Sequence, residues 1–188
     1  MGTGESLRAL SFIDELSGTR NRRGFFLLAG RKLSAAHAGG AGATVVLAVV
    51  RGLADANAWH GRAAGTELIR DAARALSAAF GPYDLIARLG GGEFVVLTAS
   101  EPEDVRERIA AAVKDRNELA AERPYKLDLA VGVASAGPGD ALTVDDLIAA
   151  ADRDLHDRDG ASPPGPPPVR APKAKRAGRG QQRRSAAA

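Results

Sequence analysis

The chain contains no cysteine, and this absence excludes disulfides, zinc–thiolate sites and thiol nucleophiles. Long apolar runs are also missing. The longest, over 45–50, is far below the roughly 20 residues that span a bilayer, and it fits a buried strand instead. Residues 1–6 lack the basic and apolar regions of a signal peptide. These absences together predict a cytoplasmic protein with no membrane span.

Acidic residues are missing from the end of the chain, where residues 160–188 hold seven basic side chains and no acidic ones. Removing these seven from the 26 basic residues of the chain leaves 19 in 1–159, against 23 acidic ones. The body of the chain therefore carries a net charge of about −4. The pI of about 9.6 belongs to the tail, and a mildly acidic body is a poor starting point for binding nucleotide phosphates.

Proline is concentrated in the same tail, because six of the ten prolines fall within 163–172. Such a segment cannot bury enough apolar surface to offset the entropy lost on ordering, so we expect 161–188 to be a disordered basic tail. Counterion release would support contact with nucleic acid or anionic lipid, but a solvated linker with weak, non-specific polyanion contacts is the favoured interpretation. The rest divides into an N-terminal extension, 1–10, and one domain over 11–160.

Helix and strand signals alternate along this domain. Apolar residues at i, i+4 spacing in 63–80 form the stripe of an amphipathic helix. The segment 44–50, which contains the apolar run over 45–50, is typical of a central strand, and the glycines at 90–92 join two short strands as a hairpin. The predicted order is helix, strand, helix, strand, strand, helix, strand, helix, over 21–37, 44–50, 63–80, 84–87, 94–97, 100–119, 127–134 and 143–157.

A hairpin embedded in this order excludes an all-parallel doubly wound sheet. It predicts an α/β (α+β) fold: a mixed sheet with a ferredoxin-like core and helices packed on its faces. Two of the helix starts carry a capping-box pattern, Ser100 with Glu103 and Thr143 with Asp146.

Four motifs carry a family resemblance when they are taken in order along the chain. They read DELSGTRNRRGF at 14–25, RLGGGEF at 88–94, AVGVA at 130–134 and ADRDL at 151–155. Together they resemble the GGDEF family, whose bacterial domains condense two GTP molecules into cyclic di-GMP. The resemblance covers nearly all of 11–160 and implies a nucleotide-cyclase-like fold with the signature on the hairpin.

The signature itself departs from the family pattern. The family holds two Mg²⁺ ions with an Asp at the end of its first strand and with the acidic third position of the signature. Those positions fall on Val49 and Gly92, and a second family Asp falls on Arg51. One remaining carboxylate does not make a Mg²⁺ site, so we expect no metal site and no catalytic residue among the signature residues Gly90, Gly91, Gly92, Glu93 and Phe94.

The positions that bind nucleotide in the family have changed as well. The family reads guanine with an Asn and an Asp, which fall on Asn57 and Thr66, and Thr66 lacks the charge to accept the guanine N–H pair. A phosphate-contacting Lys falls on Asp159. The inhibitory product site uses Arg-x-x-Asp, and here Asp84 matches the Asp while Gly81 takes the Arg position. We therefore expect weak remnants of a nucleotide site at Asn57 and Thr66, and of the inhibitory site at Asp84.

Three functions remain open from the sequence. The leading one is a catalytically degenerate GGDEF domain that serves, without a cofactor, as a regulatory or protein-interaction module in bacterial cyclic di-GMP signalling. The alternatives are a non-catalytic GTP-binding sensor and an active diguanylate cyclase with unconventional ligands, and only these would use GTP and Mg²⁺. Because only about ten residues precede the first motif, we expect no attached sensory domain and expect another protein or signalling domain as the partner.

Overall fold

The computed structural model of the chain describes residues 11–159. The expected N-terminal extension and the expected disordered tail lie outside the described residues. The described strands are β1 (Arg20–Asn21), β2 (Ala43–Val50), β3 (Leu85–Gly90), β4 (Glu93–Thr98) and β5 (Leu129–Ala136). The described helices are α2 (Arg22–Ala38), α3 (Leu53–His60), α4 (Arg62–Ala79), α5 (Pro102–Leu119) and α6 (Val144–Asp159).

The strands form one mixed sheet in the order β1-β3-β4-β2-β5. β1 runs parallel to β3, and the other neighbouring strands are antiparallel. Without β1, the order β3-β4-β2-β5 is that of a ferredoxin-like sheet. In this fold, a helical crossover connection precedes the central hairpin along the chain and another follows it. The predicted fold class and the predicted hairpin are therefore confirmed.

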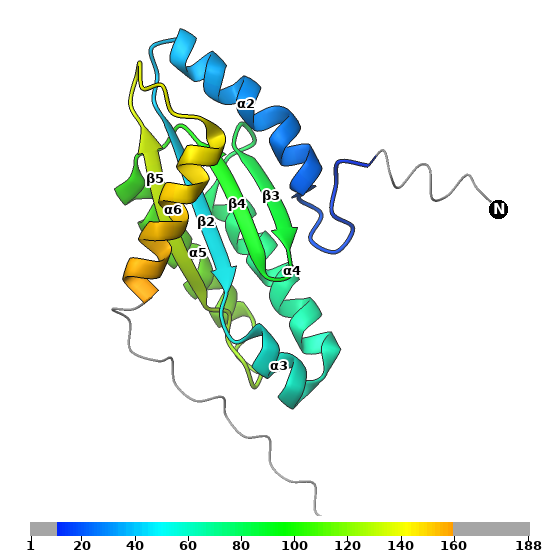
Figure 1. The fold of residues 1–188 in the computed structure, drawn as a ribbon. Helices are drawn as coiled ribbons and strands as arrows, with labels where there is room; N and C mark the ends of the chain where they lie inside the picture. Colours follow the sequence, from blue (N-terminus) through cyan, green and yellow to red (C-terminus); the bar gives the residue numbers. More distant parts are fainter. Residues whose placement is uncertain (1–10, 160–188) are drawn as a thin grey trace, which may run out of the picture.

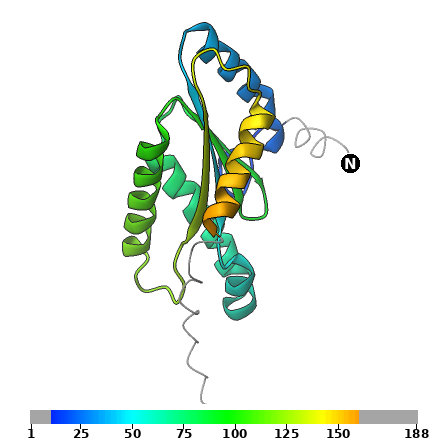
Figure 2. The same ribbon diagram turned by 60° about the vertical axis from the view of Figure 1, so that its left-hand side comes forward.

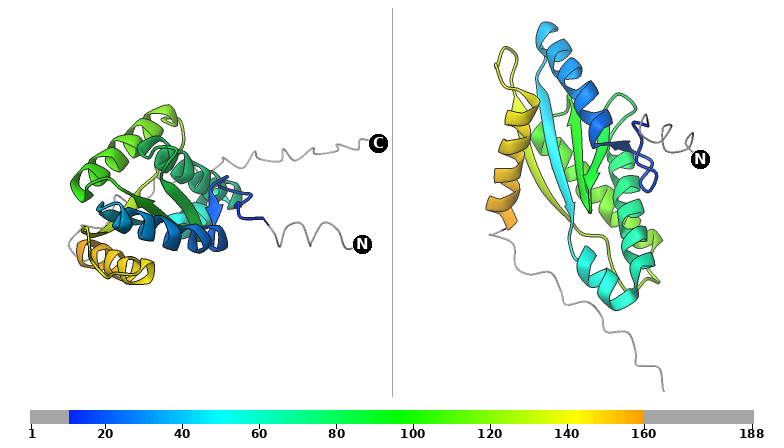
Figure 3. Two further views of the ribbon diagram at one scale, coloured as in Figure 1. Left: turned by 90° about the horizontal axis from the view of Figure 1, so that it is seen from above. Right: turned by 45° about the vertical axis from the view of Figure 1, so that its right-hand side comes forward.

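Helices cover both faces of the sheet and give the molecule three layers (Figure 1). Figure 2 shows the sheet nearly edge-on between α5 and α6, and the view from above in Figure 3 places α2 and α6 on one face and α4 and α5 on the other. Val45 and Val46 are both fully buried, yet they belong to different apolar clusters, one under each helical layer. Because side chains alternate between the two faces of a strand and both faces of β2 are covered, residues 45–50 of this strand are all apolar.

The apolar stripe predicted for 63–80 is buried in full. Its five members, four on α4 and one just after it, are buried in one apolar cluster: Ala64, Leu68, Ala72, Leu76 and Phe80. α4 ends where Phe80 takes an extended backbone conformation, one residue before the predicted Gly-Pro stop. The helical period in the sequence therefore located this element and its inward face correctly.

The two predicted capping boxes have different outcomes. The Thr143 N–H donates to Asp146 Oδ2 at 2.9 Å and the Asp146 N–H donates to Thr143 Oγ1 at 3.2 Å, which confirms the box at the start of α6. The box predicted at Ser100 is wrong. α5 begins at Pro102, so the cap position moves to Glu101, which makes no side-chain capping bond, and the Ser100 N–H donates to Thr98 Oγ1 at 3.1 Å.

Helix α6 packs very closely on the edge strand β5. A Cβ at Gly132 would lie 2.0 Å from the Ala151 carbonyl oxygen, so only glycine allows this approach. Asp154 of α6 accepts a hydrogen bond from the Val133 N–H at 2.8 Å, and Arg106 of α5 pairs with Asp154 and donates to the Val131 carbonyl at 2.9 Å. These side chains occupy the hydrogen-bonding groups of an otherwise open sheet edge.

Within residues 11–159, no helix combines the length and the apolar character that crossing a membrane would require.

Candidate functional site at the signature hairpin

The signature turn lies beside the end of β2, at the end of the sheet where α3 begins (Figure 1). The Val50 N–H donates to the Gly92 carbonyl at 3.0 Å, and this bond joins the two segments. In the antiparallel register Val49 stands opposite Glu93. Sequence positions that are about 40 residues apart are thus brought together by the β2–β4 pairing.

The predicted ligand positions Val49 and Gly92 do not share a face of the sheet. Val49 packs against the apolar cluster under α2 and α6. A Cβ at Gly92 would instead lie 3.0 Å from Val50 Cβ and 3.1 Å from Leu53 Cδ2, on the face covered by α3 and α4. The space beside Gly92 is therefore filled by apolar side chains, and the carboxylate that stands nearest to Val49 in the register is Glu93, which is exposed.

Mg²⁺ requires several hard oxygen ligands in near-octahedral geometry. In the described part of the chain, no group of three or more His, Asp or Glu side chains is placed to hold a metal ion. Glu93 is a carboxylate of the hairpin that could contribute an oxygen ligand. The side chains beside the hairpin at Val49, Val50 and Leu53 offer no oxygen ligands. The residues present do not fit the metal that the family uses at this place.

Arg88 fixes the conformation of the signature turn. Its Nε and Nη2 donate to the Gly91 carbonyl at 3.0 and 2.7 Å, and its Nη1 lies 3.1 Å from both carboxylate oxygens of Asp14. Partial burial would raise the pKa of Asp14, but hydrogen bonds from the hydroxyl and N–H of Ser17 and from Arg88 outweigh it and lower that pKa. Both charged residues stand in predicted motifs, but the sequence carried no signal that paired them.

The predicted nucleotide remnants Asn57 and Thr66 are brought close together. Asn57 is exposed on α3, and its side chain lies over Gly65 of α4, where a Cβ would be 2.3 Å from Asn57 Oδ1. Thr66 follows Gly65 directly and is half-buried. The α3–α4 corner therefore places the Asn57 amide against Gly65, the residue that precedes Thr66 in α4.

Asp84 has a local structural partner. The Gly81 N–H donates to Asp84 Oδ2 at 2.8 Å, and the Asp84 N–H donates to the Gly81 carbonyl at 3.1 Å. The carboxylate that matches the family's inhibitory site thus closes the turn before β3. The predicted remnant at Asp84 therefore has a fold role that requires no ligand.

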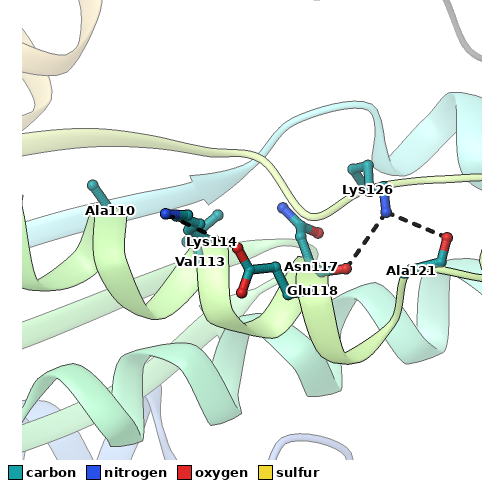
Figure 4. A pocket seen from close by; sticks show the side chains of 7 residues that line it. All are labelled: Ala110, Val113, Lys114, Asn117, Glu118, Ala121 and Lys126. Atoms are coloured by element: carbon teal, nitrogen blue, oxygen red, sulfur yellow. Dashed lines mark hydrogen bonds and ion pairs between the residues drawn. The ribbon is translucent and has the colours of Figure 1, made fainter.

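A shallow cavity of about 470 Å³ lies elsewhere, on α5 and the segment that follows it (Figure 4). Asn117 exchanges hydrogen bonds with the backbone of Leu127 at 2.8 and 2.9 Å, and Lys126 reaches the carbonyls of Asn117 and Ala121 at 3.4 and 3.5 Å. These bonds tie the end of α5 to the start of β5. The cavity therefore reflects a helix end and its connection and shares no residue with the hairpin.

Comparison with known families agrees with the fold and with the motifs. Residues 11–159 match the family described as diguanylate cyclase, GGDEF domain. The chain belongs to the GGDEF family, which acts in cyclic di-GMP signalling.

Relatives and solved structures of this family differ in length. An uncharacterized protein of Streptomyces griseus is 33% identical over 166 residues, which are 86% of this chain and 68% of that protein. An uncharacterized protein of Mycobacterium tuberculosis is 34% identical over 152 residues, which are 78% of this chain but only 24% of that protein. This chain therefore corresponds to a small part of the mycobacterial relative.

Two solved structures are similar enough to compare in sequence as well as in fold. A sensory box/GGDEF family protein from Caulobacter crescentus has a TM-score of 0.67 at 27% identity, and the match covers 81% of this chain and 100% of that one. The diguanylate cyclase SiaD from Pseudomonas aeruginosa, solved in complex with its activator SiaC, has a TM-score of 0.70 at 25% identity, covering 84% of this chain and 61% of that one.

Proposed function

We propose that this chain is a catalytically degenerate GGDEF domain that regulates cyclic di-GMP signalling by binding another protein or signalling domain. The observation that carries the proposal is the apolar surroundings of the two positions where the family places metal-binding carboxylates. Val49 is half-buried and packs against an apolar cluster, and a Cβ at Gly92 would meet the side chains of Val50 and Leu53. The module would need neither Mg²⁺ nor GTP.

The size of the expected catalytic loss supports this proposal. Metal stabilisation of the developing charge is worth several kcal/mol, and each ~1.4 kcal/mol changes the rate tenfold. Loss of both metal ligands and of the phosphate-contacting Lys, at Asp159, should lower the rate by a factor on the order of a thousand or more. A protein with that deficit contributes nothing useful as a cyclase and can be retained as a binding module.

A protein partner has a precedent within the family. The similar cyclase SiaD forms a complex with its activator SiaC, so a GGDEF-containing protein can be controlled through protein contact. For this chain the partner would be another protein or signalling domain, and the basic tail would add only weak contacts with polyanions.

The first test is turnover. The full-length protein should form no detectable cyclic di-GMP from GTP and Mg²⁺ when products are separated by chromatography and identified by mass, with SiaD as the positive control. Product that accumulates above a buffer control, and that disappears when Glu93→Ala is introduced, would instead identify an active cyclase with unconventional ligands.

A GTP sensor is the second candidate, because Asn57 remains exposed beside Thr66 at the α3–α4 corner. Calorimetric titration with GTP, with and without Mg²⁺, separates the two candidates. An absence of binding heat would support the protein-binding module. Micromolar binding that Asn57→Ala abolishes would establish the sensor and overturn the leading proposal.

A further inference from the structure

Helix α2 has an outer side that is uncovered and strongly basic. The helix packs mainly on β1 and β3, and no described element lies on its outer side (Figure 1, Figure 3). It contains four basic residues and no acidic one, although residues 1–159 as a whole are net acidic. The four basic residues, all exposed, are Arg22, Arg23, Arg31 and Lys32. The charge of this surface is therefore not neutralised within the helix.

Two large apolar side chains stand among these charges. Phe26 and Leu27 are 37% and 49% exposed, and the Arg22 guanidinium lies over the Phe26 ring at 5.6 Å. A guanidinium that stacks on a ring still presents N–H donors at its edge, where a carboxylate can accept them. Exposed apolar side chains that are flanked by such donors indicate a surface that binds an acidic protein partner.

Gly30 is the third feature of this surface. It is exposed in the middle of α2, where glycine costs stability relative to alanine. Its backbone is not among the described glycines with positive φ. Apart from chain neighbours and the nearby backbone of α2, a Cβ at Gly30 would meet no atom within 4 Å. Neither the conformation nor the packing of the described domain requires glycine here, whereas close approach of a second backbone does.

The position of Gly30 in the helix suits the side chain of a second helix. Leu27, Gly30, Arg31 and Ser34 stand at i, i+3, i+4 and i+7, which are the four corners of a hole in knobs-into-holes packing. All four are exposed. Two small corners make the hole open, the Leu27 corner is apolar, and the Arg31 corner is cationic. A large apolar knob beside a carboxylate fits this set of corners.

We propose that the outer side of α2 binds an acidic amphipathic helix of the partner protein. An apolar side chain of that helix lies over Gly30, and its carboxylates accept hydrogen bonds from Arg22 and Arg31. The inference rests on the proposed function, because it names the surface through which the partner acts.

Other occupants fit the three features less well. Binding to a lipid surface strengthens with the apolar area that is buried, and a glycine adds nothing to that area. A second α2 would bring like charges together, because this helix carries no acid. An acidic helix satisfies the arginines, the two apolar side chains and the glycine together.

The size of the contact sets the expected affinity. The 17 residues of α2 give a helix about 26 Å long, and contact along a single helix is small for a specific interface. We therefore expect a dissociation constant on the order of tens of micromolar, which rises with salt.

The test is fluorescence anisotropy of a labelled, designed helical peptide of about 20 residues, with Leu along one side and Glu flanking it. Full-length wild-type protein should bind it with the affinity given above. A matched peptide with Lys in place of every Glu should bind at least about tenfold more weakly.

Variants of α2 should lose this binding while they remain folded. Gly30→Leu fills the hole, and Arg22→Glu with Arg31→Glu reverses the charge, so each should weaken binding by about tenfold or more. The matched control is Lys114→Glu with Lys126→Glu on the α5 side, which changes the net charge equally and should bind like the wild type. Circular dichroism and thermal unfolding verify that each variant folds.

Three results would overturn the inference. They are a wild type that does not bind the Glu peptide, binding that the α2 variants leave unchanged or the control variant loses equally, and α2-dependent binding to phosphatidylserine vesicles in place of the peptide. The second result would assign the binding to net charge or to the basic tail, and the third to a membrane. None of these results changes the turnover assay, so failure of this inference is distinguishable from failure of the proposed function.

Discussion

Arg88 joins the opening motif to the signature hairpin, because it contacts both Asp14 and the Gly91 carbonyl in the signature turn. The two charged residues are 74 positions apart, and their side chains are only 14% and 23% exposed. Charge-assisted hydrogen bonds in such a partly buried place are stronger than surface ion pairs. The conformation of the signature turn is thus held by a contact that does not involve a nucleotide.

Removing Arg88 should destabilise the fold without involving any ligand. We expect Arg88→Ala to lower the free energy of unfolding by about 2–3 kcal/mol, and a double-mutant cycle with Asp14→Ala to give a coupling of about 1 kcal/mol. Urea denaturation measures both values. The control is Arg70→Ala, which removes a surface pair with Glu67 and should cost less than about 0.5 kcal/mol. Equal losses of stability for Arg88→Ala and Arg70→Ala would contradict the role of Arg88 in holding the signature turn.

Restoring the missing signature carboxylate should not restore activity. Gly92→Asp adds a side chain that points at Val50 and Leu53, which lie 3.0 and 3.1 Å from the new Cβ, while Val49 still supplies no oxygen. We expect no cyclic di-GMP and a loss of stability of about 1–3 kcal/mol. Gly92→Ala separates the steric part of this loss from the burial of a charge. Robust turnover by the Asp variant would show that the metal position is wrongly placed.

Asp154 should make the free energy of unfolding depend on pH in the acidic range. Partial burial would raise its pKa, but hydrogen bonds from Arg158, the Val133 N–H and Arg106 outweigh this and lower the pKa from 3.8 to about 2. A lowered folded-state pKa contributes stability that is fully present above the unfolded pKa and is lost as the pH falls from about 4 to about 2. Because the side chain is 27% exposed, we expect a contribution on the order of 1–2 kcal/mol.

The Asp154→Asn variant tests this assignment. It should be less stable than the wild type at neutral pH, and the difference in the free energy of unfolding should shrink between about pH 4 and about pH 2. Urea denaturation at several pH values in that range measures the difference. A gap between the two proteins that stays constant with pH would mean that the Asp154 carboxylate does not carry the effect.

Position 132 of β5, where α6 packs closely on the sheet, should tolerate no side chain larger than that of glycine. A methyl group at Gly132 would overlap the Ala151 carbonyl at 2.0 Å and the backbone of Leu155 at 2.8 Å. Gly132→Ala should therefore lower the free energy of unfolding by about 3 kcal/mol or more. Gly30→Ala is the matched control: apart from its chain neighbours and the nearby backbone of α2, no atom lies within 4 Å of its Cβ position, so it should stabilise the protein by about 0.5–1 kcal/mol. Thermal and urea unfolding of the two variants give the comparison.

The sequence alone determined the elements whose patterns are strong and local. The buried stripe of α4 follows the helical period, β2 follows a continuous apolar run, and the β3–β4 hairpin follows its glycines. With the element order known, the embedded hairpin already excluded an all-parallel sheet. The family resemblance rested on the same local motifs, and it is confirmed over residues 11–159.

Weak local patterns explain the elements that sequence reasoning missed. α3 buries only Ala56 among its residues and therefore shows no apolar stripe. β1 is two residues long and is a strand only because it pairs with β3, which is far along the chain. The false capping box at Ser100 had the right residue types, but Pro102 begins the helix and moves the cap to Glu101.

Tertiary structure alone decided which distant residues meet. It paired Asp14 with Arg88, placed Gly132 under α6, and turned positions 49 and 92 towards opposite faces of the sheet. Periodicity and propensity describe a residue and its near neighbours, whereas these contacts depend on strand register and on how each helix packs against the sheet. The residue types of the candidate site were therefore legible in the sequence, but the direction in which each side chain points was set by the folded chain.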